Sequence, residues 1–222
     1  MQIPGIPVIP VIPVFAVEDS PPTLRALRKL LSGSERVELV GTATSGEDAL
    51  REVPVKAPRV VLMDLELPGA SGIETTRSLK ASCDLEVLVL TSFEDEQHVF
   101  DAMRAGASGY VVKGAQAGKL IEAIVEVEAG GTVIEPRLAR RFWQYFKGVQ
   151  EPLKPSVPQL TDLEREILSM IARGLSNEEA GRIVSLDRRS VRTQLGHIYA
   201  KLGVRSHVEA VVKGLKLGMI EI

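Results

Sequence analysis

Cysteine is almost absent from this chain, since Cys83 is the single example among 222 residues. One cysteine cannot form an intramolecular disulfide framework, and it cannot build a cysteine-ligated metal site unaided. We therefore expect the protein to work in a reducing compartment, the cytoplasm, with Cys83 chemically inert.

Signals for secretion or membrane insertion are missing as well. Residues 1–14 are apolar and uncharged, but they carry no basic segment and no small-residue cleavage site. Prolines at positions 4, 7, 10 and 13 would break a membrane-spanning helix. We expect an extended, polyproline-like tail over residues 1–13 and no membrane partner.

A strong charge of either sign is also missing, because the formal net charge is −2. Residues 1–158 contain 17 basic and 21 acidic side chains, whereas residues 159–222 contain 10 and 8. The positive surplus of the C-terminal part is a small indication of an anionic partner there. The length suits two domains, and 45% apolar with 25% charged residues is typical of soluble globular chains.

From residue 14 onward, five short apolar runs alternate with five stretches of helical periodicity. This alternation predicts a doubly wound α/β domain, in which helices cover both faces of a five-stranded parallel sheet. Because proline in a central strand lacks a backbone donor, we place the start of the first strand at Val14. The expected strands are 14–20, 37–43, 60–66, 86–92 and 108–114, and the expected helices are 23–31, 46–53, 73–81, 94–105 and 117–129.

A linker is expected after this domain, which we assign to residues 14–135. The segment "PRLARRFWQYFK" (136–147) favours a short helix with proline at its first position. The next segment, "GVQEPLKPSVP" (148–158), contains three prolines and no apolar periodicity, which is typical of a linker.

Residues 159–222 predict a small all-α domain of four helices. Thr161 with Glu164 and Ser176 with Glu179 fit the capping-box pattern, and Asp187 is a suitable N-cap for a third helix. The expected helices are 163–174, 178–185, 188–203 and 207–219.

Five polar side chains are expected at one edge of the parallel sheet. Glu18 and Asp19 end the first strand, Asp64 ends the third, Thr91 ends the fourth and Lys113 ends the fifth. Because the carboxyl ends of parallel strands open on one edge, these groups should converge. Three carboxylates raise one another's proton affinity unless a cation lies between them, and Mg²⁺ prefers such oxygen ligands.

With a cation in place, Asp64 is expected to act as a nucleophile that accepts a phosphoryl group. Thr91 and Lys113 would then donate to the phosphoryl oxygens, as phosphoryl transfer requires. The alternative is a set of solvated strand-end residues with no joint function. The coincidence of five such groups at one edge favours the functional interpretation.

The segments "VFAVEDS", "VVLMDLELPG", "LVLTSF" and "GASGYVVKG" together resemble a response-regulator receiver domain, which has a flavodoxin-like fold. The resemblance covers residues 14 to about 135 and implies that Asp64 is the phosphoacceptor. It implies that Thr91 and Lys113 contact the phosphoryl group and that Thr91 and Tyr110 form a switch. A half-buried strand aromatic without a switching role is the alternative for Tyr110.

The same resemblance implies a Mg²⁺ site formed by Glu18, Asp19, Asp64 and the backbone carbonyl of Glu66. Glu18 departs from the aspartate that is commoner in the family at its position. That departure puts the metal affinity in doubt rather than the assignment of the site.

The sequence from Gln159 to Val212 resembles the LuxR-type helix-turn-helix domain, so the whole chain resembles a response regulator of the NarL/FixJ group. Its pattern of helix, short turn and helix has Gly181 where the two helices approach closely. The N-terminal part of the helix at 188–203 is expected to enter the major groove of DNA. Residues at core spacing on that helix are Val191, Leu195, Ile198 and Leu202.

The exposed polar residues of this region are the candidate DNA contacts. Arg192 can contact guanine and Gln194 can contact adenine, although phosphate contacts are an alternative for both. Gln194 and Gly196 depart from residues that are common in the family, so its base preferences do not transfer. A solvated basic helix face is the alternative, and His197 and His207 are expected to be packing or surface residues. The candidate contacts are Arg188, Arg189, Ser190, Arg192, Thr193, Gln194, Lys201 and Arg205.

These patterns together predict a transcription regulator that is switched by phosphorylation and is not an enzyme. A sensor histidine kinase is the expected donor, promoter DNA is the expected target, and the phosphorylated protein is expected to form a homodimer. The last expected helix carries an apolar stripe that resembles the family's dimerising helix, although it fits a domain core equally well. Two rivals are a DNA binder that does not depend on phosphorylation and, with less support, a Mg²⁺-dependent phosphohydrolase.

Overall fold

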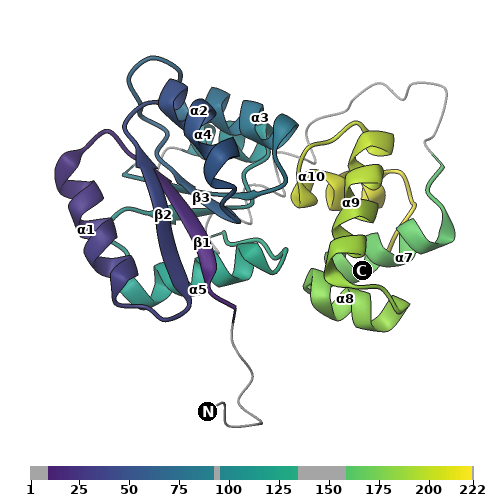
Figure 1. Ribbon diagram of the computed structural model, residues 1–222. Coiled ribbons are helices and arrows are strands. Elements are labelled where there is room, and N and C mark those ends of the chain that lie inside the picture. The colour runs from purple at the N-terminus through teal and green to yellow at the C-terminus, as the bar shows by residue number, and fades with distance from the viewer. Residues whose placement is uncertain (1–9, 93–95, 135–158, 222) are drawn as a thin grey trace, which may run out of the picture.

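The computed structural model describes residues 10–92, 96–134 and 159–221, apart from the side chains of residues 91, 96 and 97. The N-terminal domain contains a parallel five-stranded sheet with the strand order β2-β1-β3-β4-β5 (Figure 1). The doubly wound α/β prediction is confirmed. The strands are β1 (Ile12–Val17), β2 (Val37–Ala43), β3 (Val60–Met63), β4 (Glu86–Thr91) and β5 (Gly109–Val112).

Helices cover both faces of this sheet, as Figure 1 shows. All four residues of β3 are buried, which explains why its sequence is a continuous apolar run rather than an alternating one. Leucines of α1 and α5 pack on one face, while α2, α3 and α4 cover the other. The helices are α1 (Pro21–Ser32), α2 (Gly46–Lys56), α3 (Gly72–Ser82), α4 (Glu96–Ala105) and α5 (Ala117–Glu128).

The start of β1 differs from the prediction, because the strand includes Pro13 and begins at Ile12. The pairing of β1 with β3 begins one residue later, at Val14 opposite Val60. The missing donor of Pro13 therefore falls at the end of that ladder, where its carbonyl still accepts from the backbone N–H of Arg59 at 2.8 Å.

Helix α2 also continues past its predicted end, with Pro54 inside the helix. A proline in the last turn costs one backbone hydrogen bond without preventing the residues after it from remaining helical. The helix ends at Ala57, which has a left-handed φ of 46° and whose N–H bonds to the Val53 carbonyl. The predicted end at residue 53 was therefore three residues too early.

The C-terminal domain consists of four helices, as predicted. Both capping boxes and the Asp187 N-cap are present. A Cβ atom on Gly181 would lie 2.5 Å from the carbonyl oxygen of Leu186, so the turn requires glycine there. The four core-spaced residues of α9 are buried in the domain core. The helices are α7 (Asp162–Ala172), α8 (Asn177–Val184), α9 (Arg188–Leu202) and α10 (His207–Lys216).

Helix α10 is shorter than predicted, because Gly218 adopts a left-handed φ of 64° just after it. Met219 therefore lies beyond the helix and does not extend its apolar stripe. Val211 and Leu215 pack against the core of their own domain, whereas Val208 packs against the N-terminal domain.

Several expectations lie outside the described residues. These are the polyproline-like conformation over residues 1–9, the helix at 136–147 and the linker at 148–158. Within the described ranges, every helix is too short or too polar to cross a membrane.

We predict that Gly72→Ala destabilises the N-terminal domain, because an added Cβ would lie 1.9 Å from the Asp64 carbonyl oxygen. Relieving such a clash costs about 1–3 kcal/mol. The matched control is Gly118→Ala in α5, where no atom lies within 4 Å of the new Cβ. There the better helix propensity of alanine should stabilise by about 0.5–1 kcal/mol. Urea unfolding measures both, and equal midpoints for the two variants would contradict the prediction.

Candidate functional site

Three strand ends of the N-terminal domain bring Glu18, Asp64 and Lys113 into contact. These residues follow β1, β3 and β5 directly, so they lie at the carboxyl edge of the sheet. Lys113 Nζ donates to Asp64 Oδ2 at 2.8 Å and lies 2.7 Å from Glu18 Oε2. The exposed Asp19 adds a third carboxylate, and one oxygen from each of the three acids lies within 4.8 Å of the others. The expected convergence is observed for these four residues.

Burial makes it costly to keep the groups of this pocket charged. Glu18 and Asp64 are 1% and 3% exposed. Burial raises the pKa of Glu18, and the nearby Asp64 raises it further, although the hydrogen bond from Lys113 opposes both. Burial alone would lower the pKa of Lys113, but its hydrogen bonds to Asp64 and Glu18 outweigh burial and raise it. One ammonium group is thus the counterion of two buried carboxylates, with a third beside them.

The donor set in the pocket fits a hard divalent cation. Three carboxylates supply oxygen atoms, which are the ligands that Mg²⁺ prefers. The backbone N–H of Glu66 points to Asp64 Oδ1 at 3.4 Å, which places this residue beside the carboxylates. Whether the Glu66 carbonyl binds the metal stays a prediction.

The loop after β3 is held by contacts that were not predicted from the sequence. Gly69 has a left-handed φ of 79°, which a side chain would disfavour. Glu47, from the start of α2, accepts a hydrogen bond from the backbone N–H of Ala70 at 2.9 Å. The Pro68-Gly69 pair signals the turn, but nothing in the local sequence indicates its bond to α2.

The two expected switch residues lie on neighbouring strands. Thr91 is the last residue of β4 and pairs with Val112 of β5, but its side chain is outside the described residues. Tyr110 is 2% exposed, so it is fully buried rather than half-buried. Its cluster contains Met103 of α4, with Val208 of the C-terminal domain packed against it. Tyr110 therefore belongs to an apolar cluster that also contacts the second domain.

The basic start of α9 faces the N-terminal domain instead of solvent. Arg192 Nη2 lies 2.8 Å from Glu86 Oε1, and Arg192 Nε lies 2.8 Å from Asp84 Oδ1. Arg188 Nη2 lies 2.7 Å from Glu128 Oε1. The side chain of Arg192 is 15% exposed and that of Arg188 is 27% exposed. Both were expected to be exposed, and that expectation is corrected, because helix periodicity does not reveal which other domain covers a polar face.

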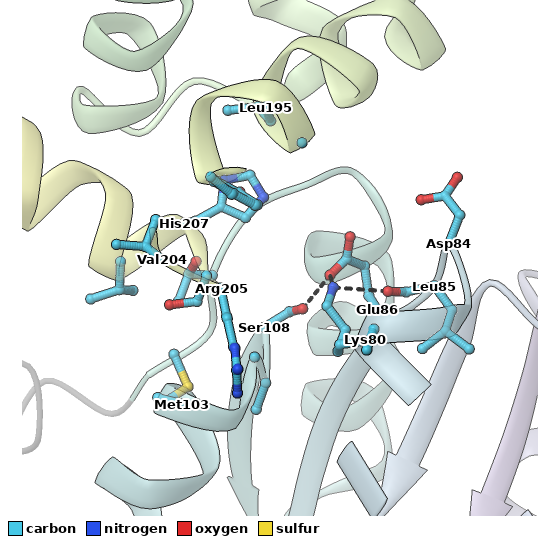
Figure 2. A pocket seen from close by; sticks show the side chains of 18 of the residues that line it. Lys80, Asp84, Leu85, Glu86, Met103, Ser108, Leu195, Val204, Arg205 and His207 are labelled. Carbon is cyan, nitrogen blue, oxygen red and sulfur yellow. Dashed lines mark hydrogen bonds and ion pairs between the residues drawn. The ribbon is translucent and has the colours of Figure 1, made fainter. Parts of the chain in front are cut away.

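Glu86, the first residue of β4, is the centre of this contact (Figure 2). Besides Arg192, its carboxylate accepts from Lys80 Nζ at 3.0 Å and from the Ser108 hydroxyl. Glu86 is 4% exposed. Burial raises its pKa, but Lys80 and Arg192 outweigh burial and lower the pKa to about 2. The buried carboxylate is therefore ionised and shared between two cations, a role that was missed because Glu86 reads as an ordinary strand-start residue.

The other candidate DNA contacts have mixed surroundings. Lys201 Nζ lies 2.6 Å from Glu164 Oε2 within the C-terminal domain. The roles of all these candidate residues in DNA binding stay predictions. Arg189, Thr193, Lys201 and Arg205 are exposed, whereas Ser190 and Gln194 are partly buried.

Both domains match known protein families. Residues 14–125 match the response regulator receiver domain, and residues 158–213 match the luxR family of bacterial regulatory proteins. The DNA-binding transcriptional activator DevR/DosR of Mycobacterium tuberculosis (strain ATCC 25618 / H37Rv) is 34% identical over 204 residues, covering 91% of this chain and 94% of the relative. The transcriptional regulatory protein DesR of Bacillus subtilis (strain 168) is 31% identical over 204 residues, covering 92% and 96%.

A solved structure agrees with these relatives. The response regulator ChrA of a heme-sensing two-component system is 30% identical, with a TM-score of 0.52 and coverage of 95% of this chain and 99% of that chain. Because both domain families match and the relatives align over nearly the full length, this protein belongs to the NarL/LuxR family of two-component response regulators, which are DNA-binding transcription regulators.

Proposed function

We propose that Asp64 is the residue through which this regulator is switched, by accepting a phosphoryl group from a sensor histidine kinase. The observation that carries the proposal is the ammonium of Lys113 between two buried carboxylates, Asp64 and Glu18, at the carboxyl edge of the sheet. The ammonium offsets only one of the two buried carboxylate charges, and Asp19 adds a further negative charge, so the pocket retains an excess that a divalent cation would offset. With that cation and Lys113 in place, the pocket is suited to a reaction that adds negative charge to Asp64.

In this transfer, an Asp64 carboxylate oxygen forms a bond to phosphorus while the bond between phosphorus and the donor histidine nitrogen breaks. Glu18, Asp19, Asp64 and the Glu66 carbonyl would hold Mg²⁺, which would supply positive charge to the phosphoryl oxygens. Lys113 donates to a phosphoryl oxygen, and Thr91 is proposed to do the same from β4. Tyr110 and Thr91 then change their packing as the switch.

We propose that the observed closed arrangement of the two domains is the resting state. Arg192 and Arg188, two of the candidate DNA contacts, are engaged by acidic residues of the receiver domain. A recognition helix held in this way cannot place the same arginines against DNA. Phosphorylation is proposed to shift the population toward an open form in which α9 is free.

The open, phosphorylated form is proposed to dimerise on promoter DNA. Two copies of α9 would then occupy half-sites about 34 Å apart, roughly one helical turn. Opening also frees Val208 of α10, which packs against the receiver domain in the closed arrangement. The free thiol of Cys83 agrees with a reducing, cytoplasmic location for this exchange.

The two rival functions predict different behaviour of the same pocket. A Mg²⁺-dependent phosphohydrolase would turn over small phosphate esters, whereas the proposed switch is modified once and retains the phosphoryl group. A regulator that does not depend on phosphorylation would bind DNA equally well with and without a modified Asp64.

Acetyl phosphate with Mg²⁺ should phosphorylate the wild type, tighten its DNA binding and shift its sedimentation toward a dimer. Asp64→Asn should show none of these effects, because the amide is not a nucleophile for phosphorus. Asp48→Asn, an acid of α2 outside the pocket, is the matched control and should behave like the wild type. Identical DNA binding by treated wild type and Asp64→Asn would support the phosphorylation-independent rival instead.

Lys113→Met should lower the free energy of unfolding by about 3 kcal/mol, because it leaves two buried carboxylates without their counterion. Added Mg²⁺ should restore more stability in this variant than in the wild type, since the metal then supplies the missing positive charge. Thermal unfolding with about 10 mM Mg²⁺ or with EDTA measures both the loss of stability and the response to the metal. An equal Mg²⁺ response in both proteins would argue against a metal site at these carboxylates.

Glu86→Gln should tighten DNA binding by the unphosphorylated protein about three- to tenfold, because loss of the charge that holds Arg192 raises the open fraction. The amide preserves the shape of the side chain and can still accept from Ser108. Glu38→Gln, on the exposed part of β2, is the control and should leave the affinity unchanged. Fluorescence anisotropy measures both affinities, and weaker binding by Glu86→Gln would contradict the closed resting state.

A further inference from the structure

The contact between the domains contains a histidine, His207, at the first position of α10 (Figure 2). Its ring packs edge-on against Tyr199 with a centroid distance of 5.7 Å. The Nδ1 atom is buried and has no hydrogen-bond partner within the part of the chain that the structure describes. His207 lines a cavity of about 370 Å³ between the two domains, and the adjacent Val208 packs against the receiver domain. Separating the domains would therefore change the surroundings of this imidazole directly.

Charged groups from every packed element face this space, and among the described residues that line it each carboxylate is already paired. The buried carboxylate nearest to it, Glu86, already accepts hydrogen bonds from Lys80, Ser108 and Arg192. Asp84 pairs with Arg192 and is largely exposed. The facing groups are Arg77 and Lys80 from α3, Asp84 and Glu86 around the start of β4, Arg192 and Tyr199 from α9, and Arg205 before α10.

We propose that His207 is a proton-sensitive release group, whose protonation opens the closed arrangement without phosphorylation of Asp64. Among the described residues that line the cavity, no unshared buried carboxylate offsets a third positive charge beside Lys80 and Arg192, and none accepts a hydrogen bond from the buried Nδ1. Opening lets water solvate the imidazolium and separates it from Lys80 of the receiver domain, although it separates it from Glu86 as well. This inference rests on the proposed closed resting state, but it adds a second input to the same switch.

The direction of the pH effect follows from the pKa of His207. Burial lowers this pKa to about 4, and Lys80 and Arg192 lower it as well, while Glu86 opposes them. An exposed histidine has a pKa of about 6.5. Because the closed form binds the proton more weakly, its stability relative to the open form is lost as the pH falls from about 6.5 toward 4. Protonation of Glu86 also destabilises the closed form, but only at pH values below its ordinary pKa of 4.5.

Glu209, on the same helix, acts in the opposite direction. Burial raises its pKa, although the backbone N–H of Arg205 and the charge of Arg104 oppose this. Its protonation therefore favours the closed form. The test must for that reason isolate His207 by substitution and cannot rely on the net pH response alone.

The experiment measures the ratio of open to closed molecules by single-molecule energy transfer, in the full chain carrying Asp64→Asn. Dyes are attached through Arg25→Cys and Arg173→Cys, both exposed positions on separate domains, with Cys83→Ser in the background. Between pH 7.5 and pH 5.5 the ratio should rise roughly tenfold. His207→Gln and His207→Phe, the latter keeping a ring against Tyr199, should abolish the rise or reverse it through Glu209. His197→Gln, an exposed histidine of α9, should leave it intact.

The possible failures separate the two proposals. A protein that is closed at both pH values, or His207 variants that respond like their parent, would overturn the role of His207 while leaving the closed resting state in place. A protein that is already open at pH 7.5 would overturn the closed resting state itself. Because the readout requires neither DNA binding nor a phosphorylated Asp64, failure of the phosphoryl switch would not change the result.

Discussion

The buried carboxylate of Glu86 is the interaction on which the arrangement of the two domains depends. It lies at the first residue of β4, and its partners come from α3, the start of β5 and α9. A buried ionised group requires compensation on several sides, and here one of the required cations is supplied by the second domain. Helix α9 is thus tied to the receiver domain through the compensation that the Glu86 charge requires.

The two charge clusters lie at opposite edges of the same sheet and are connected by β4. Glu86 begins this strand at the amino edge, and Thr91 ends it beside the carboxylate pocket. A strand of this length spans about 15–20 Å, which is too far for direct electrostatic control in water. The buried Tyr110 and Met103 instead share an apolar cluster with Val208 of α10. This cluster joins packed residues of β5 and α4 to the second domain.

The sequence could predict features that depend on local periodicity and strand topology. The ends of three strands placed Glu18, Asp64 and Lys113 at one edge, and the capping boxes at Thr161 and Ser176 marked helix starts. It could not predict the partners of Arg192, because an amphipathic pattern identifies a polar helix face but not which part of the protein packs against that face. The continuation of α2 past Pro54 and the full burial of Tyr110 were missed for a related reason, since tertiary packing overrides local preference at both.

A switch of this kind requires a domain contact that is neither permanent nor negligible. A ligand can shift a two-state equilibrium only by its differential affinity, so the closed form must be favoured by no more than a few kcal/mol. The observed contact has that character, because its ion pairs include the largely exposed Asp84 and a cavity of about 370 Å³ remains beside them. A close-packed apolar interface would have excluded this space and made opening costly. In the proposed switch, the imperfect fit around Glu86 and His207 would therefore allow small changes in charge to release α9.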